Sequence, residues 1–215
     1  MSQPEASDAA RIEQAVTSGT FSLDGGTWAV DNNVWLLGND RECVLIDAPH
    51  QAEPIRALVG DRRVLAILCT HAHDDHVTVA RELAEGFDAP VRLHPDDEVL
   101  WRQSYPDFDF TPLRAGESIL VAGTELTVLA TPGHSPGAVC FYVPSLATVF
   151  TGDTLFQGGP GATGRSYSDF DTIIDSITRS LLTLPPQTRV LTGHGGATTI
   201  GDEAPHRDEW IARGH

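Results

Sequence analysis

Histidine and aspartate residues are concentrated in one short segment near the middle of the first half of the chain. His71, His73 and His76 lie in the string HAHDDH, together with Asp74 and Asp75. The string follows a continuous apolar run at 64–69, which is typical of a strand buried on both faces. A helical pattern at 77–84 begins directly after it. We therefore expect this loop to bring its side chains together above the edge of a sheet.

Neutral imidazole and carboxylate are good ligands for Zn²⁺. An isolated HxH pair is more often an incidental feature of a solvated polar loop, because short motifs frequently arise by chance. The full HxHxDH pattern at the end of a buried strand is far more specific. It indicates a metal site.

Three further segments each place one metal-compatible residue after an apolar strand or in a glycine-rich turn. These residues are His134 in TPGHSPG, Asp153 in FTGDT and His194 in LTGHG. Adjacent glycines permit tight turns and a close approach of the backbone. A single loop histidine would usually have a structural role. The coincidence of all three with the HAHDDH segment strengthens the prediction of a metal centre.

Short strands and one-faced helices are expected in both halves of the chain. The expected strands are 27–30, 33–37, 43–46, 64–69, 118–121, 125–130, 138–143, 148–151 and 189–191, and the expected helices are 52–59, 77–84 and 171–182. Strands mixed with amphipathic helices predict a layered α/β fold, with two packed sheets and helices outside. The pattern indicates one domain after a loose N-terminal segment.

The charge balance excludes several classes of function. Lys and Arg total 14 against 30 Asp and Glu, for a net charge of −16. A phosphate backbone or an anionic membrane surface requires a basic face, so neither nucleic acid nor a membrane is an expected partner. Every cation is arginine. The absence of lysine excludes Schiff-base chemistry and a P-loop or kinase lysine.

Cysteine usage and the chain start favour a cytoplasmic protein. Cys43, Cys69 and Cys140 show no CxxC spacing, so a disulfide framework is not expected. The polar, acidic N-terminus lacks the features of a signal peptide. No apolar run approaches the ~20 residues needed to cross a bilayer.

The motif set resembles that of the metallo-β-lactamase-fold hydrolases, over about residues 20–194. The resemblance implies a four-layer αβ/βα sandwich at 20–215, preceded by a loose segment at 1–19. It implies a first metal held by His71, His73 and His134, a second held by Asp75, His76 and His194, and Asp153 bridging the two. Asp74 falls on the variable position of the motif. The implied cofactors are two zinc ions, with iron or manganese as alternatives in one or both positions.

Asp153 and the string TGDTLF resemble the glyoxalase II group of this family. That group implies hydrolysis of a small-molecule thioester, an S-acyl thiol, by a hydroxide between the metals, with Asp75 steering it. Only about twenty residues follow His194, so the group's C-terminal helical domain, which helps to hold glutathione, is not expected here. The all-arginine composition and the tail TIGDEAPHRDEWIARGH resemble actinobacterial chains, which implies mycothiol as an alternative to glutathione.

Other residues have expected supporting roles. Arg165 and Tyr167, in the glycine-rich stretch 157–171, are the candidates for substrate contact. Asp47, at a strand end, matches a family position behind the ligands, where a carboxylate orients a ligand histidine. The remaining histidines, His50, His94, His206 and His215, are expected on the surface or in loops.

Several alternatives stay open on the sequence. A thiolate is a fair leaving group without an acid, which favours thioesters over amides. A mononuclear iron persulfide dioxygenase would use two histidines and one aspartate of the same set. A lactonase or esterase is a further alternative, which Tyr167 leaves open, and a non-catalytic metal-binding protein would have lost at least one ligand. A homodimer is expected only from general frequency.

Overall fold

The structure is a computed structural model and describes residues 8–214. Its first sheet contains β1 (Arg11–Leu23), β2 (Gly26–Gly38), β3 (Glu42–Ile46), β4 (Arg63–Leu68), β5 (Val91–Leu93) and β6 (Thr111–Pro112). Its second sheet contains β7 (Ser118–Val121), β8 (Thr124–Ala130), β9 (Val139–Val143), β10 (Thr148–Gly152), β13 (Arg189–Thr192) and β14 (Thr198–Thr199). A separate small ribbon is formed by β11 (Leu155–Phe156) and β12 (Gly159–Pro160).

The helices connect the strands on the outside of the two sheets. They are α1 (Ala52–Val59), α2 (Asp74–Val77), α3 (Ala80–Phe87), α4 (Glu98–Ser104), α5 (Phe170–Ser176), α6 (Ile200–Glu203) and α7 (Arg207–Arg213). Helix α5 continues as a wider π-helical turn, and three short 3₁₀ turns complete the helical segments: Ile177–Leu181, Pro95–Asp97, Pro144–Leu146 and Ala204–His206.

Each six-stranded sheet combines antiparallel and parallel pairing. The first follows the strand order β1-β2-β3-β4-β5-β6 and is parallel from β3 to β6. The second follows the order β14-β13-β10-β9-β8-β7, in which β10 and β13 are parallel. Connections between parallel strands cross over through helices. The carboxyl ends of β4, β10 and β13 are therefore free to carry loops.

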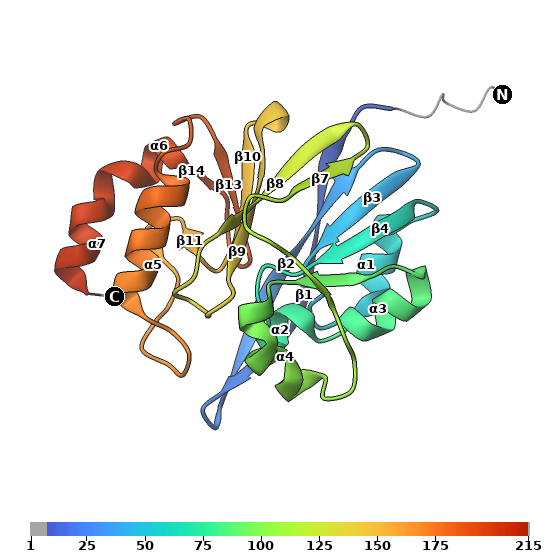
Figure 1. The fold of residues 1–215 in the computed structure, drawn as a ribbon, viewed down its shortest axis with the longest axis horizontal. Coiled ribbons are helices and arrows are strands. Elements are labelled where there is room, and N and C mark those ends of the chain that lie inside the picture. Colours follow the sequence, from blue (N-terminus) through green and yellow to red (C-terminus); the bar gives the residue numbers. More distant parts are fainter. Residues whose placement is uncertain (1–7, 215) are drawn as a thin grey trace.

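Side-chain alternation along the strands divides the core into three layers of packing. In β2, Trp35 and Leu37 face the second sheet, whereas Val34 and Leu36 face the helices α1, α3 and α4. On the second sheet, Val149 and its neighbours face α5 and α7. This is the two-fold periodicity of strands buried on both sides. The result is the expected α/β sandwich with two central sheets and helices outside (Figure 1).

The N-terminal boundary that we expected is wrong for residues 11–19. These residues form the first part of β1, which pairs with β2 along its full length, from Arg11 opposite Gly38 to Leu23 opposite Gly26. No apolar alternation marks this part of the strand, because Thr17 is buried whereas Val16 is exposed. Residues 1–7 of the expected loose segment lie outside the described residues.

Most expected elements are present, with corrected boundaries. The expected strands 27–30 and 33–37 are one continuous strand, β2. The expected helix 77–84 is two helices, α2 and α3, and α2 already includes the acidic residues of the HAHDDH string. The three cysteines are free and buried. Among the helices of residues 8–214, none is long and apolar enough to span a membrane.

Candidate metal centre

Loops from both sheets bring the seven predicted ligand residues to one place. His71 and His73 follow β4, and Asp75 and His76 lie in α2. The other three come from the second sheet, where they follow β8, β10 and β13: His134, Asp153 and His194. Three groups each have ligand atoms within 4.8 Å of one another: His71, His73 and His134; His71, His76 and Asp153; Asp75, His76 and His194. The grouping agrees with two adjacent metal positions.

The ring orientation of several histidines is fixed by a contact outside the cluster. His134 Nδ1 donates to the carbonyl of Ala162 at 2.8 Å, and His194 Nδ1 donates to the carbonyl of Asp31 at 2.8 Å. The Nδ1 of His71 lies 3.1 Å from Thr70 Oγ1. Such outer contacts select the tautomer and leave Nε2 free as a ligand.

The predicted position of Asp47 behind the ligands agrees with the geometry. Its Oδ2 lies 2.9 Å from His76 Nδ1, and its carboxylate also accepts the amide and hydroxyl of Thr70. Asp47 is buried and has a φ of 63°, a left-handed conformation that costs free energy in a residue other than glycine. The strained backbone places the Asp47 carboxylate against His76, whose ring it orients.

A buried nitrogen atom without a partner shows that the residues present fit a metal ion. His71 Nε2 is buried and has no hydrogen-bond partner among the described residues, and His73 faces the same cluster through its Nδ1, 3.0 Å from His134 Nε2. A buried polar atom without a partner costs about 1–3 kcal/mol. The chemistry of the whole set, five imidazoles and two carboxylates, matches zinc and related transition metals.

The site is divided electrostatically into two parts in the metal-free protein. Burial and the neighbouring imidazoles lower the pKa of His73 to about 3 and that of His71 well below its usual value. Burial would also lower the pKa of His194, but Asp153 and Asp75 outweigh it and raise the pKa to about 10. The pKa of His76 is raised in the same way. His71 and His73 are therefore neutral at pH 7, whereas His76 and His194 are protonated.

This division predicts unequal release of protons when zinc binds to metal-free protein. The ion held by His71, His73 and His134 should displace almost none from His71 and His73. The ion held by Asp75, His76 and His194 should displace one from each histidine, because the pKa of His194 is raised to about 10, that of His76 is raised well above its usual value, and ligands must be deprotonated. Affinity for the second ion should rise with pH up to about 10.

Titration calorimetry in buffers of different ionisation enthalpy measures this release directly. His194→Ala should remove one proton from the second step only, and His206→Ala, a substitution of an exposed histidine, should change neither step. Equal release in both steps would contradict the division.

A buried carboxylate that the sequence analysis missed joins the two loops that carry the first group. Asp97 accepts hydrogen bonds from the Ala72 amide and the Ser135 hydroxyl, both at 2.8 Å, and from the Gly137 amide at 2.5 Å. Burial raises the pKa of Asp97, and these three donors oppose the rise. Asp97 lies at the end of a 3₁₀ turn, 21 residues past the HAHDDH string, where no local motif marks it.

Asn32 is a second missed residue. It donates from Nδ2 to Asp75 Oδ2 at 3.0 Å, and its Oδ1 lies 2.7 Å from His50 Nε2. His50, expected in a surface loop, is half-buried and orients this amide. Asn32 lies in the middle of β2, where no local motif marks it.

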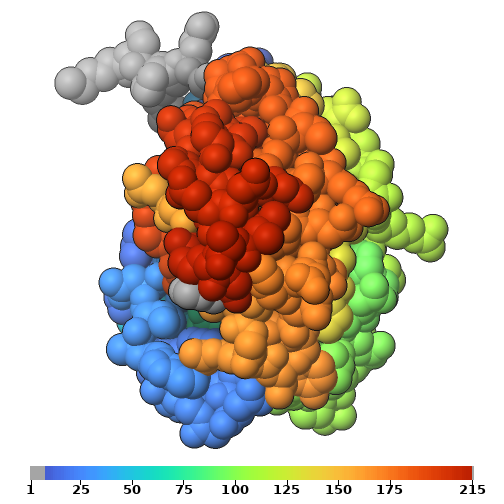
Figure 2. Space-filling model, turned by 90° about the vertical axis from the view of Figure 1, so that its left-hand side faces the viewer, coloured from blue at the N-terminus to red at the C-terminus, as the bar shows by residue number. Residues whose placement is uncertain are grey.

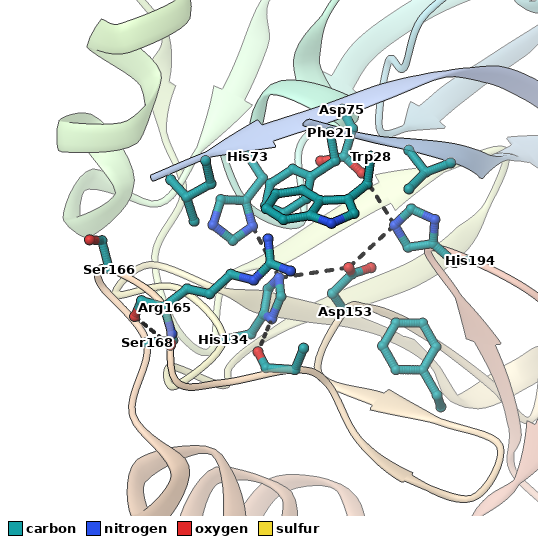
Figure 3. A pocket seen from close by; sticks show the side chains of 14 residues that line it. Phe21, Trp28, His73, Asp75, His134, Asp153, Arg165, Ser166, Ser168 and His194 are labelled. Atoms are coloured by element: carbon teal, nitrogen blue, oxygen red, sulfur yellow. Dashed lines mark hydrogen bonds and ion pairs between the residues drawn. The ribbon is translucent and has the colours of Figure 1, made fainter. Parts of the chain in front are cut away.

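A cavity of about 300 Å³ opens on the cluster. Its lining combines five of the predicted ligands with apolar side chains from the β1–β2 hairpin and with Arg165 (Figure 3). Tyr167, the other candidate for substrate contact, lies elsewhere. Its side chain lines a neighbouring hollow with the hairpin turn and does not line this cavity, since its φ of 69° turns the chain away at that point.

The residue before His194 must be glycine for a steric reason. A Cβ at Gly193 would collide with Asp153 Oδ1 and with the His76 ring, so only glycine permits the loop after β13 to approach the cluster.

Two packed sheets between layers of helices, with a histidine and aspartate cluster at the loop ends of both sheets, define a metal-dependent hydrolase class. The family model described as Metallo-beta-lactamase superfamily matches residues 27–194, and the chain belongs to this superfamily.

Relatives include both named and uncharacterised proteins. The probable metallo-hydrolase YqgX of Bacillus subtilis is 36% identical over 178 residues, covering 75% of this chain and 84% of that protein. Hydroxyacylglutathione hydrolase GloC of Haemophilus influenzae is 33% identical over 181 residues, covering 77% and 85%. A di-iron-bound form of TTHA1623 has 39% identity and a TM-score of 0.74, with 81% of this chain and 93% of that chain covered.

Proposed function

We propose that this metallo-hydrolase is a thioester hydrolase of the glyoxalase II type that acts on an S-acyl thiol. The observation that carries the proposal is the complete set of seven ligand residues around one centre, beside a largely apolar cavity. The similarity to GloC, which is named a hydroxyacylglutathione hydrolase, supports the same reaction class.

The ligand residues would hold two metal ions, one in each of two groups. His71, His73 and His134 would hold one metal ion, and Asp75, His76 and His194 the other. Asp153 approaches both groups, with its Oδ2 3.3 Å from His194 Nε2 and 3.7 Å from His134 Nε2, so its carboxylate would lie between the ions. When bound, two such ions supply a hydroxide at neutral pH and polarise the substrate carbonyl.

In this proposal the carboxylate of Asp75 would orient the attacking water. Asn32 fixes one of its oxygens, and the pKa of Asp75, which burial would raise, is lowered to about 2 by His76 and His194. Asp75 therefore stays ionised and accepts a hydrogen bond throughout the reaction. A thiolate can leave without protonation because thiols have a pKa near ~8.5.

The cavity offers no spare acid for an amine leaving group. Among the described lining residues, the acidic side chains are Asp75 and Asp153, and both belong to the ligand set. We therefore expect thioester hydrolysis to exceed amide hydrolysis by about 10³-fold or more, since protonation of a leaving group contributes about 10²–10⁴-fold.

The test compares an S-acyl and an N-acyl compound with the same acyl group, on one preparation whose metal content is measured by elemental analysis. About two metal ions per chain, with thioesterase activity lost on chelation, is the expected result. Comparable rates on the two compounds, or activity without metal, would refute the proposal.

Two other reactions are outcomes of the same experiment. A mononuclear iron dioxygenase needs only two histidines and one aspartate, fewer than this centre provides. One iron per chain, with oxygen consumption on a persulfide and little hydrolysis, would identify it. TTHA1623 is described in a di-iron-bound form, so the identity of the bound metal does not by itself follow from the fold. The metal is therefore identified in the same experiment as the reaction. Hydrolysis of lactones alone would identify a lactonase, although Tyr167 lies outside the cavity.

A further inference from the structure

One side of the cavity is an apolar wall formed by the β1–β2 hairpin. Alternate residues of each strand share a face, and Phe21 lies directly opposite Trp28 in the register. The hairpin wall consists of Phe21, Leu23, Trp28 and Val30. Phe21 also contacts the metal cluster, since its ring centroid lies 5.2 Å from that of His73. The wall therefore extends from the reaction centre to the rim of the cavity.

The other side presents one arginine, whose guanidinium rests on this wall. Arg165 Cζ lies 3.9 Å from the Trp28 ring centroid and 5.3 Å from the Phe21 ring centroid (Figure 3). Stacking uses the face of the guanidinium and leaves its N–H groups free at the edge. Within residues 8–214, no hydrogen bond or ion pair engages this guanidinium.

The segment that carries Arg165 is attached to the hairpin and to itself. The Ser166 amide donates to Asp24 Oδ2 at 3.0 Å, and hydrogen bonding by the Ser166 side chain and amide lowers the pKa of Asp24. The Arg165 amide donates to Ser168 Oγ at 3.1 Å, and the Ser168 hydroxyl donates back to the Arg165 carbonyl at 2.8 Å. In Figure 2 the orange loop lies beside the blue hairpin. Arg165 is thus held in place before any ligand arrives, which reduces the entropic cost of binding.

The charge inventory of the lining limits what can bind. Arg165 is the one side chain of fixed positive charge among the described lining residues, and the chain contains no lysine. A ligand with one anionic group can be matched, whereas further anionic groups inside the cavity would remain unpaired, at a cost.

We propose that the substrate carries one carboxylate near its thioester, separated from it by an apolar segment. Arg165 binds the carboxylate through its free edge, and the hairpin wall buries the segment between. This inference rests on the proposed thioesterase function and specifies its substrate class.

The contacts also limit the separation of the two groups. Phe21 lies between Arg165 and His73. Its ring centroid is 5.3 Å from Arg165 Cζ and 5.2 Å from the His73 ring centroid, so Arg165 Cζ lies at most about 10.5 Å from the His73 ring. A linker of a few methylene groups spans that distance. The carboxylate can belong to the acyl group or to the thiol, and the experiment separates these sources.

The experiment uses two matched pairs of thioesters with the metal-loaded protein. In the first pair the acyl group carries the charge: S-adipoyl-N-acetylcysteamine against its methyl ester. In the second the thiol carries it: S-hexanoyl-mercaptopropionate against S-hexanoyl-N-acetylcysteamine. For at least one pair, wild-type kcat/KM should favour the acid by about 10–100-fold, the range expected for hydrogen bonds to a charged group.

Arg165→Met keeps an apolar chain on Trp28 and removes the charge. It should abolish the preference by lowering kcat/KM for the acid about 10–100-fold more than for the neutral compound, because the charged contact is made by the acid alone. Arg165→Lys should restore part of the preference, since an ammonium lacks the planar fork. Equal loss on acid and neutral compounds, or an unchanged preference in Arg165→Met, would overturn the proposal.

Binding of the corresponding thioethers, which cannot be hydrolysed, separates this inference from the function on which it rests. Calorimetry should show the same acid preference and its loss in Arg165→Met. If wild-type protein binds the acidic thioethers through Arg165 but hydrolyses none of the thioesters, the proposed function fails and the carboxylate site stands. If thioesters are hydrolysed with no acid preference in either pair, the function stands and the carboxylate site is wrong.

Discussion

Replacing Asp75 with asparagine is expected to lower kcat/KM for thioester hydrolysis by about 10³-fold. A catalytic metal ion contributes several kcal/mol of transition-state stabilisation, and each 1.36 kcal/mol is worth tenfold. The asparagine would keep the size of the side chain but lose the charge that faces His76 and His194. Elemental analysis should find about one metal ion per chain, retained by His71, His73 and His134.

Asp74 provides the matched control, one residue away in the same helix. Its carboxylate accepts the Ser22 amide at the hairpin and belongs to none of the three ligand groups. Asp74→Asn should keep both metal ions and stay within a few-fold of wild-type activity. Two retained ions and full activity in Asp75→Asn would show that the second metal group is assigned wrongly.

Replacing Asp97 with alanine is expected to lower the free energy of unfolding by about 3 kcal/mol or more. The substitution leaves two amides and one hydroxyl without their acceptor, and each unsatisfied buried donor costs about 1–3 kcal/mol. Urea unfolding of the metal-free protein measures this loss without a contribution from metal binding. Affinity for the first metal ion should fall as well, because Asp97 holds both loops that supply its ligands.

Two further substitutions make this result specific. Ser135→Ala removes one of the three contacts, so it should cost about 1 kcal/mol and remain measurable if Asp97→Ala does not fold. Asp96→Ala changes the exposed neighbour and should stay within about 0.5 kcal/mol of wild type. A similar stability for Asp97→Ala and Asp96→Ala would contradict the role assigned to Asp97.

The sequence predicted the layered fold and the convergence of the seven residues because both depend on local patterns. A buried strand, a tight loop and a helix follow one another in the chain around His71, and glycines mark the loops at His134 and His194. Parallel strands then place such loops at the same end of a sheet. Strand β1 was missed in part because residues 11–19 lack an apolar alternation, with Thr17 buried and Val16 exposed.

The supporting residues depend on contacts between distant parts of the chain, which no local pattern records. Asp97 is 40 residues from Gly137, and Asn32 is 43 residues from Asp75. The stacking of Arg165 on Trp28 also joins distant parts of the chain. From the sequence, Arg165 was only a candidate for substrate contact. Tyr167, two residues further on, had equal local support, and only the backbone turn at that residue separates their positions.

The division of the ligands between the two sheets has a mechanical consequence. Any ion that binds both His73 and His134, or both Asp75 and His194, acts as a cross-link between the halves of the sandwich. Because such an ion binds only the folded state, it stabilises the protein by mass action. Hydrogen exchange should therefore slow most on metal binding at the loop ends where the sheets meet, and least at the opposite end, around the β7–β8 turn. The metal content would then set how tightly the two halves of the molecule are coupled.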